Sequence, residues 1–211
     1  MKKSIYSLVL SDEVVAEIDR MAYQLHTSRS NLINQILAEH LSCVTPEMRM
    51  QAVFSHMEQM MQQFRILEQT SDRMLSLQSQ LDYKYKPTVQ YFVKLYPVPE
   101  GEKVGVLRVV LRTQNLNLIQ NLDQFFRLWV QWEQKYAPCA EGTVYELSAG
   151  KLERSIHNPC DEETELAELI GEYVTRFDKY LKAWFAGNSD PVSIAEKLEK
   201  AFSQEHITKS I

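Results

Sequence analysis

The chain has 211 residues, of which 45% are hydrophobic and 24% are charged, so its composition is that of a folded protein with room for one small and one medium domain. Its formal net charge of −5 argues against a protein that coats nucleic acid, and limits any such contact to a local patch. Three cysteines without close pairing indicate neither a disulfide framework nor a zinc knuckle, and no apolar run is long enough to span a membrane. We therefore expect a cytoplasmic protein with no membrane partner.

The first segment predicts a strand followed by two short helices. Residues alternate from Ser4 to Leu10 with the period of a strand, and Ser11 is suited to cap the helix that follows. A second helix is expected to begin within residues 27–30, where a serine-rich cluster precedes an apolar stripe. A unit of roughly forty residues cannot bury enough apolar surface to be stable alone, so two copies should associate.

This order of strand, cap, helix and serine-rich turn resembles the ribbon-helix-helix family of bacterial DNA-binding proteins, of the Arc, MetJ and CopG type. The likeness rests on the strand that ends in Leu10 and Ser11, on the stripe from Ile18 to Ala22, and on the TSRSNLI motif that opens the second helix. In that family the strands of two chains pair into an antiparallel ribbon that enters the major groove. The resemblance therefore implies a homodimer that binds double-stranded DNA and that could assemble further on it.

The resemblance also assigns roles to individual residues. The ribbon face in the groove would consist of Ile5, Ser7 and Val9, with Lys3 at its edge. Phosphates would be anchored at the start of the second helix, where backbone N–H groups and the helix dipole favour anions, by Ser28, Arg29 and Ser30. The dimer core would contain Tyr6, Leu8, Leu10, Ile18 and Ile33.

Two features weigh against the DNA-binding interpretation. Bidentate recognition of bases needs Arg, Lys, Asn or Gln, and the expected groove face offers one hydroxyl group and two branched alkyl groups. Residues 1–45 also carry more acidic than basic side chains, whereas binding by phosphate neutralisation favours a basic excess.

Residues 46–86 are predicted to form one long helix. Thr45, Pro46 and Glu47 together are a helix start signal. From Met50 to Leu81, ten residues alternate at spacings of three and four, which is the pattern of a coiled-coil seam between two chains. A long helix that lies on the C-terminal domain would also fit, because its methionines suit irregular surfaces.

Residues 87–211 predict a ββαββαα domain. Two strands over 88–96 and 103–112 form a hairpin, and an aromatic-rich helix is expected over 116–136. A second hairpin over 143–157 and two more helices follow. The fold class is therefore α+β: a ribbon-helix-helix dimer module over 1–45, a long coiled-coil-like helix over 46–86, and a C-terminal domain whose helices cover one face of an antiparallel sheet.

Catalytic and cofactor motifs are missing from the sequence. It has no glycine-rich phosphate loop, no nucleophile elbow and no H-E-x-x-H helix. The histidines lie far apart, and only His157 with Cys160 approaches the spacing of metal ligands. We expect neither an enzyme nor a metal or cofactor site.

The sequence thus favours a homodimeric, sequence-specific DNA-binding protein, most simply a transcriptional regulator. In the alternative interpretation the ribbon serves only assembly and the C-terminal domain binds a protein partner, as in an antitoxin or a plasmid partition or transfer accessory factor. The feature that distinguishes the two interpretations is the expected groove face of Ile5, Ser7 and Val9, which has few groups that can recognise bases.

Overall fold

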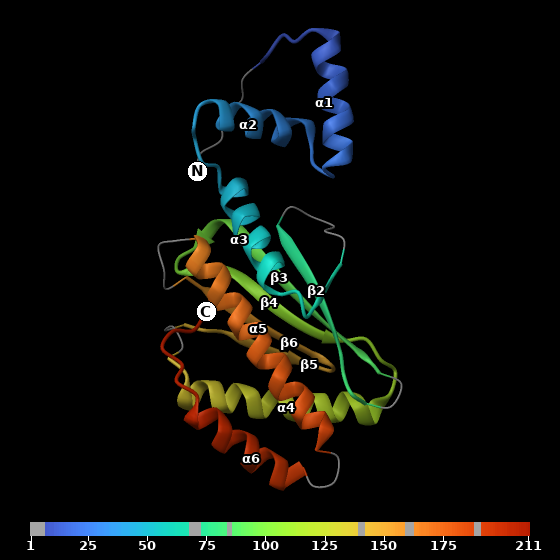
Figure 1. The fold of residues 1–211 in the computed structure, drawn as a ribbon, viewed down its shortest axis with the longest axis vertical. Coiled ribbons are helices and arrows are strands. Elements are labelled where there is room, and N and C mark those ends of the chain that lie inside the picture. The colour runs from blue at the N-terminus through green and yellow to red at the C-terminus, as the bar shows by residue number, and fades with distance from the viewer. Residues whose placement is uncertain (1–6, 68–72, 84–85, 139–141, 159–162, 188–190) are drawn as a thin grey trace.

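A computed structural model describes residues 7–67, 73–83, 86–138, 142–158, 163–187 and 191–211. Two helices near the N-terminus stand apart from a larger body, and a third helix connects them to it (Figure 1). The described helices are α1 (Asp12–Gln24), α2 (Arg29–His40), α3 (Pro46–Met60), α4 (Leu116–Tyr136), α5 (Glu163–Ala186) and α6 (Pro191–Gln204). The described strands are β1 (Arg65–Ile66), β2 (Met74–Gln80), β3 (Thr88–Glu100), β4 (Lys103–Leu111), β5 (Tyr145–Ser148) and β6 (Lys151–His157).

The strands form one antiparallel sheet in the order β1-β2-β3-β4-β6-β5. Its register places Tyr91 of β3 between Leu77 of β2 and Val109 of β4, and all three side chains are buried. Because side chains alternate along each strand, these residues define a buried inner face and leave an outer face on the opposite side.

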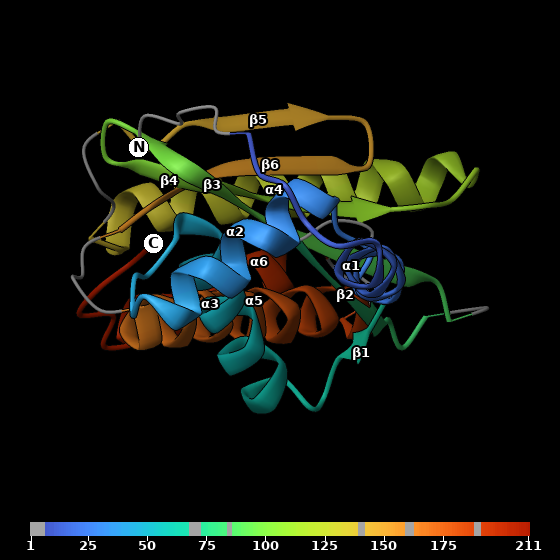
Figure 2. The ribbon, with the colours of Figure 1, turned by 90° about the horizontal axis from the view of Figure 1, so that it is seen from above.

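The inner face is covered by helices. Figure 2 shows α3 and α5 on one side of the strands. Phe177 of α5 is the centre of an aromatic cluster, with ring centroids 4.8 Å from Trp129 of α4 and 6.1 Å from Tyr91 of the sheet. Phe202 of α6 packs against the same cluster, with its ring centroid 5.3 Å from that of Trp129. Such edge-to-face contacts add to the stability that burial alone provides.

The predicted α+β class and the ββαββαα order are confirmed. Helix α4 begins at Leu116 and ends at Tyr136, as its apolar stripe predicts. No helix within the described ranges combines the length and the apolar character needed to cross a bilayer.

The long coiled-coil-like helix predicted over 46–86 is wrong. Helix α3 stops at Met60, and the residues expected to continue it form β1 and β2 instead. The first seam positions, Met50, Val53 and Met57, are buried within the same chain, where α3 packs against α5 and β3. The seam residues therefore contribute to one domain core rather than to an interface between two helices, as in the alternative in which the helix lies on the C-terminal domain.

Candidate nucleic-acid interface

Helix α1 follows Ser11, whose side chain makes no capping hydrogen bond, and it ends in a closed turn. Ser11 precedes α1 in extended conformation, and Asp12 and Glu13 occupy its first turn, where the helix dipole favours negative charge. At the other end His26 has φ 49°, and the Thr27 N–H donates to the Ala22 carbonyl at 3.0 Å. This is a Schellman closure in which histidine takes the left-handed position that glycine more often fills.

The start of α2 has the geometry of an anion site. Ser28 is the N-cap, and its Oγ accepts a hydrogen bond from the Asn31 N–H at 3.2 Å. The amides of Arg29 and Ser30 belong to the first helical turn, where no intrahelical acceptor exists. Ser28, Arg29 and Ser30 are all exposed, so the three predicted phosphate anchors lie together at one solvent-facing helix end.

The side chain of Arg29 points back towards α1. Its Nη2 donates to Asp19 Oδ2 at 2.6 Å, and its Nε pairs with the other carboxylate oxygen. This pair was not predicted from the sequence, and it holds the arginine beside the anion site rather than over it. The Arg29 side chain is 68% exposed and that of Asp19 is 37% exposed, so the pair contributes at most about 1 kcal/mol and a phosphate can compete for the guanidinium.

The predicted ribbon is only partly described. Ser7 and Val9 of the groove face, and Leu8 and Leu10 of the dimer core, are exposed and belong to neither helix nor strand. Lys3, Ile5 and Tyr6 lie outside the described residues. A strand needs the hydrogen bonds of a second strand, and the expected partner is the same segment of another copy. The ribbon therefore stays a prediction.

The two-helix unit buries little of its apolar surface. Ala22, Leu32 and Ala38 are its buried hydrophobic side chains among the described residues, while the predicted core residues Ile18 and Ile33 are half-buried. Large apolar side chains are exposed on both helices and on the segments that flank them: Leu8 59%, Val14 45%, Leu25 53%, Leu37 48% and Leu41 67%. So many exposed apolar side chains beside so few buried ones favour association with a partner that would cover them.

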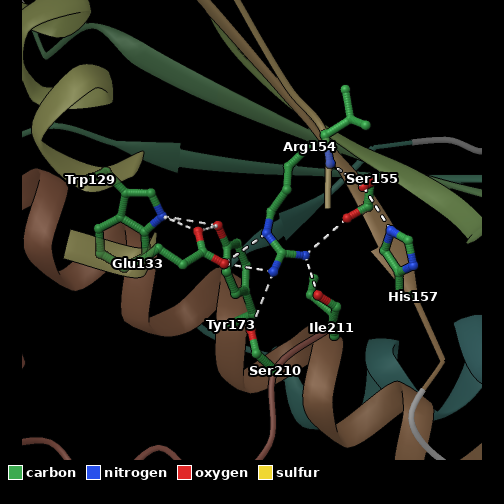
Figure 3. A network of polar contacts seen from close by, with 9 residues as sticks. Trp129, Glu133, Arg154, Ser155, His157, Tyr173, Ser210 and Ile211 are labelled. Atoms are coloured by element: carbon green, nitrogen blue, oxygen red, sulfur yellow. Dashed lines mark hydrogen bonds and ion pairs between the residues drawn. The ribbon is translucent and has the colours of Figure 1, made fainter. Parts of the chain in front are cut away.

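A second group of polar residues lies deep in the body (Figure 3). Arg154 of β6 and Glu133 of α4 form an ion pair in which each side chain is 1% exposed, with Nε donating to Oε1 at 2.7 Å. The other carboxylate oxygen of Glu133 accepts from Trp129 Nε1 at 3.1 Å and from the Tyr173 hydroxyl at 2.8 Å. The guanidinium also donates to the hydroxyl of Ser210 at 3.2 Å and to the main-chain oxygen of Ile211.

The charges of this network are fixed by their surroundings. Burial alone would lower the pKa of Arg154, but the oxygens of Tyr173 and Glu133 raise it above its ordinary value. Burial, followed by the Glu133 carboxylate, raises the pKa of Tyr173 well above its ordinary value. Both groups thus keep their protons, and the network offers neither a free base nor access to a substrate, so we regard it as structural.

Sequence reasoning missed this ion pair, although the sequence contains a signal for it. Arg154 alternates with the inward residues Leu152 and Ile156, and Glu133 directly follows the buried Trp132. A single charge on each of two apolar faces indicates a buried partner, because an unpaired buried charge is costly.

The metal ligands considered in the sequence, His157 and Cys160, are not brought into a described site, since Cys160 lies outside the described residues. Among the residues that the structure describes, no three His, Cys, Asp or Glu side chains gather in a metal-binding arrangement.

Comparison of the chain with protein-family models, with curated proteins and with solved structures found no match.

Proposed function

We propose that the chain is a homodimeric DNA-binding protein, most simply a transcriptional regulator, in which residues 1–45 of two copies pair and insert a two-stranded ribbon into the major groove of double-stranded DNA. The observation that carries this proposal is the combination, in one small unit, of an uncovered apolar surface and an exposed anion site at the start of α2.

The apolar surface supports the dimer. Complete burial of one leucine side chain contributes about 1.5–3 kcal/mol, and each copy offers several, among them Leu8, Leu37 and Leu41. Two copies double that contribution within a single interface. A second copy is the natural partner, because the exposed segment 7–10 needs a strand to pair with and its own counterpart matches its alternation.

The anion site supports the contact with DNA. The amides at the start of α2, with the hydroxyl groups of Ser28 and Ser30, are donors for one phosphate, and Arg29 adds a positive charge beside them. In a symmetric dimer the site occurs twice, once on each side of the ribbon. The ribbon residues Lys3, Ile5, Ser7 and Val9 would then face the bases, with Ser7 as the polar reader.

Sedimentation and gel-shift experiments on the full chain test this function. We expect a dimer that binds duplex DNA from the region upstream of its own gene. Arg29→Ala should weaken binding to all sequences alike and flatten the salt dependence by about one unit for each phosphate that is no longer neutralised. Ser7→Ala should instead change sequence preference.

Arg20→Ala is the matched control, because Arg20 is an exposed arginine of α1 that pairs with Glu17 of its own helix. It removes the same charge without touching the anion site. Equal effects of Arg29→Ala and Arg20→Ala would show that the start of α2 does not bind the phosphate.

The alternative function, assembly without DNA binding, is favoured by two observations. Arg29 already has a carboxylate partner in Asp19, and Val9 of the groove face presents an alkyl group. In that case the chain would sediment as a dimer and shift no DNA, and its C-terminal domain would bind a protein partner.

A further inference from the structure

The outer face of the sheet brings aromatic and basic side chains together. Cross-strand neighbours share a face, so the register places Phe92 of β3 between Ser76 of β2 and Arg108 of β4. Glu153 of β6 follows Arg108 in the same row. Lys94 and Tyr96 lie further along β3 and, by alternation, point to the same side.

The charge of this face is opposite to that of the whole chain. Its described basic side chains come from β1, the start of β2, β3, β4 and β6: Arg65, Arg73, Lys94, Lys103, Arg108 and Lys151. Its described acidic side chains are Glu100, which lies opposite Lys103, together with Glu146 and Glu153. The Glu153 carboxylate offsets part of this positive charge, since it is 2.9 Å from Arg108 Nε and 2.9 Å from Lys151 Nζ. The chain as a whole has a formal charge of −5, so cations are concentrated here.

A cleft of about 330 Å³ opens on this face between the aromatic rings. Phe92, Tyr96, Met74 and Val106 form its apolar wall, and the side chain of Arg108 is at its edge. Two ammonium groups lie close to the Tyr96 ring, with Lys94 Nζ at 5.8 Å and Lys103 Nζ at 5.7 Å from its centroid. An aromatic ring with two cations over it, and a second ring in the same cleft, match a ligand that has flat bases linked by phosphates.

The spread of the cations selects an extended ligand. Arg65 on β1 and Lys151 on β6 are four strand steps apart, or roughly 19 Å at about 4.8 Å a step. A single phosphate or mononucleotide cannot reach both. Along β3, Phe92 and Tyr96 are four residues apart, or roughly 13 Å, which leaves room for two separate bases. Stacking on these rings requires unpaired bases, which duplex DNA does not offer.

We propose that the outer face of the sheet binds single-stranded nucleic acid, with Phe92 and Tyr96 stacking on bases and Lys94, Arg108, Arg65 and Lys151 contacting phosphates. This is a second activity, on a different part of the chain from the duplex-binding unit, and it does not depend on that unit.

Fluorescence anisotropy of the full chain, with labelled oligothymidylate and oligouridylate of roughly 12 nucleotides, tests the proposal. Binding of either strand is expected. Lys94→Glu should weaken it about tenfold and flatten the dependence on log salt by about 0.7 for each phosphate that is no longer neutralised. Phe92→Ala should weaken it about tenfold because one base no longer stacks, with circular dichroism to verify the fold.

Two control variants make the test specific. Lys197→Glu makes the same charge change at an exposed position of α6, away from the sheet, and should alter binding less than about twofold. Arg29→Ala, at the start of α2, should leave single-strand binding unchanged. Loss of binding with Arg29→Ala, equal weakening by Lys94→Glu and Lys197→Glu, or failure of the unaltered protein to bind either strand would overturn the proposal. Competition by poly-glutamate as strong as by the oligonucleotide would also overturn it, because an acidic peptide has charge without bases.

Discussion

At the scale of single residues, the Arg154–Glu133 pair is an ion pair buried in the body of the molecule, with each side chain 1% exposed. It joins β6 to α4 and, through Tyr173 and Ser210, reaches α5 and the C-terminal segment. A buried ion pair is not more stable than a well-packed apolar substitute, but loss of one partner leaves the other charge buried without compensation.

We predict that Glu133→Gln lowers the free energy of unfolding by about 3–5 kcal/mol, measured by urea denaturation. Glu199→Gln is the matched control, because Glu199 pairs with Lys135 at the surface and its loss should change stability far less. Combining Glu133→Gln with Arg154→Met should recover part of the stability, since no uncompensated charge remains. If Glu133→Gln were no more costly than Glu199→Gln, the network would not be a stabilising element.

Glu153 on the outer face gives a pH-dependent prediction. Burial alone would raise its pKa, but the hydrogen bonds from Lys151 and Arg108 lower it below the ordinary 4.5. A lowered pKa in the folded state stabilises the protein fully above the ordinary value, and this stabilisation is lost as pH falls through the lowered pKa. Glu153→Gln should therefore be less stable than the unaltered protein at about pH 7, and the difference should shrink at a pH well below 4.5.

Urea denaturation at the two pH values measures this effect. Glu146→Gln neutralises the residue directly across from Glu153 on β5 and is the control, because it removes a like charge instead of a pair. A stability difference for Glu153→Gln that persists unchanged at low pH would contradict the assignment.

The Asp19–Arg29 pair gives a prediction for the proposed DNA contact. Asp19→Asn releases the arginine and removes a negative charge next to the anion site, so duplex binding should tighten for all sequences alike. Glu17→Gln makes the same charge change on the same helix, at a carboxylate that pairs with Arg20 instead. Gel shifts that show equal tightening with both variants would mean that net charge, rather than release of Arg29, controls binding.

At the scale of elements, local periodicity predicts the helices and strands after residue 87 well, but it fails for β1 and β2. Helix α4 follows from its own residues, because an apolar stripe runs from Leu118 to Trp132 with a capping Asn115 before it. In residues 74–81 two patterns compete. Met74 and Leu81 fit a seam spaced by three and four, whereas Leu75 and Leu77 alternate as in a strand.

Long-range pairing decides between the two patterns. Leu75 and Leu77 lie opposite Val93 and Tyr91 of β3, and both are completely buried there. No local window contains that information, because the partner strand begins only after residue 87. The buried ion pair was missed for a related reason, since Glu133 and Arg154 are joined only when α4 packs on the sheet.

The corrected role of α3 predicts unequal effects at adjacent seam positions. Met57 is fully buried against the body, whereas Met60 is 39% exposed. Met57→Ala should lower the free energy of unfolding by about 2–5 kcal/mol, and Met60→Ala should have a much smaller effect. Cysteine introduced at Met60 should form no rapid disulfide between chains. Equal effects of the two alanine variants, or rapid cross-linking at position 60, would contradict the packing of α3 within one chain.

At the scale of the whole molecule, two parts differ in how complete they are within one chain. The body has a complete hydrophobic core within one chain, in which Trp129, Phe177 and Phe202 are buried. The α1–α2 unit does not, since Leu37 and Leu41 remain exposed. This difference supports the proposal that two copies associate through the N-terminal residues, whereas the core of the body needs no second copy.

The last prediction follows from this asymmetry. Leu8→Asp places a charge where two copies are proposed to meet, and an uncompensated charge is far costlier to bury than a leucine is to lose. Sedimentation should therefore show a monomer, with duplex binding abolished because each chain offers half of the ribbon. Thermal unfolding of the body and single-strand binding by the outer face should be unchanged, because neither depends on a second copy. Ser7→Asp adds the same charge on the opposite ribbon face and should leave the dimer intact while it weakens DNA binding. A dimer that survives Leu8→Asp would place the association elsewhere in the chain, and the ribbon assignment would then be wrong.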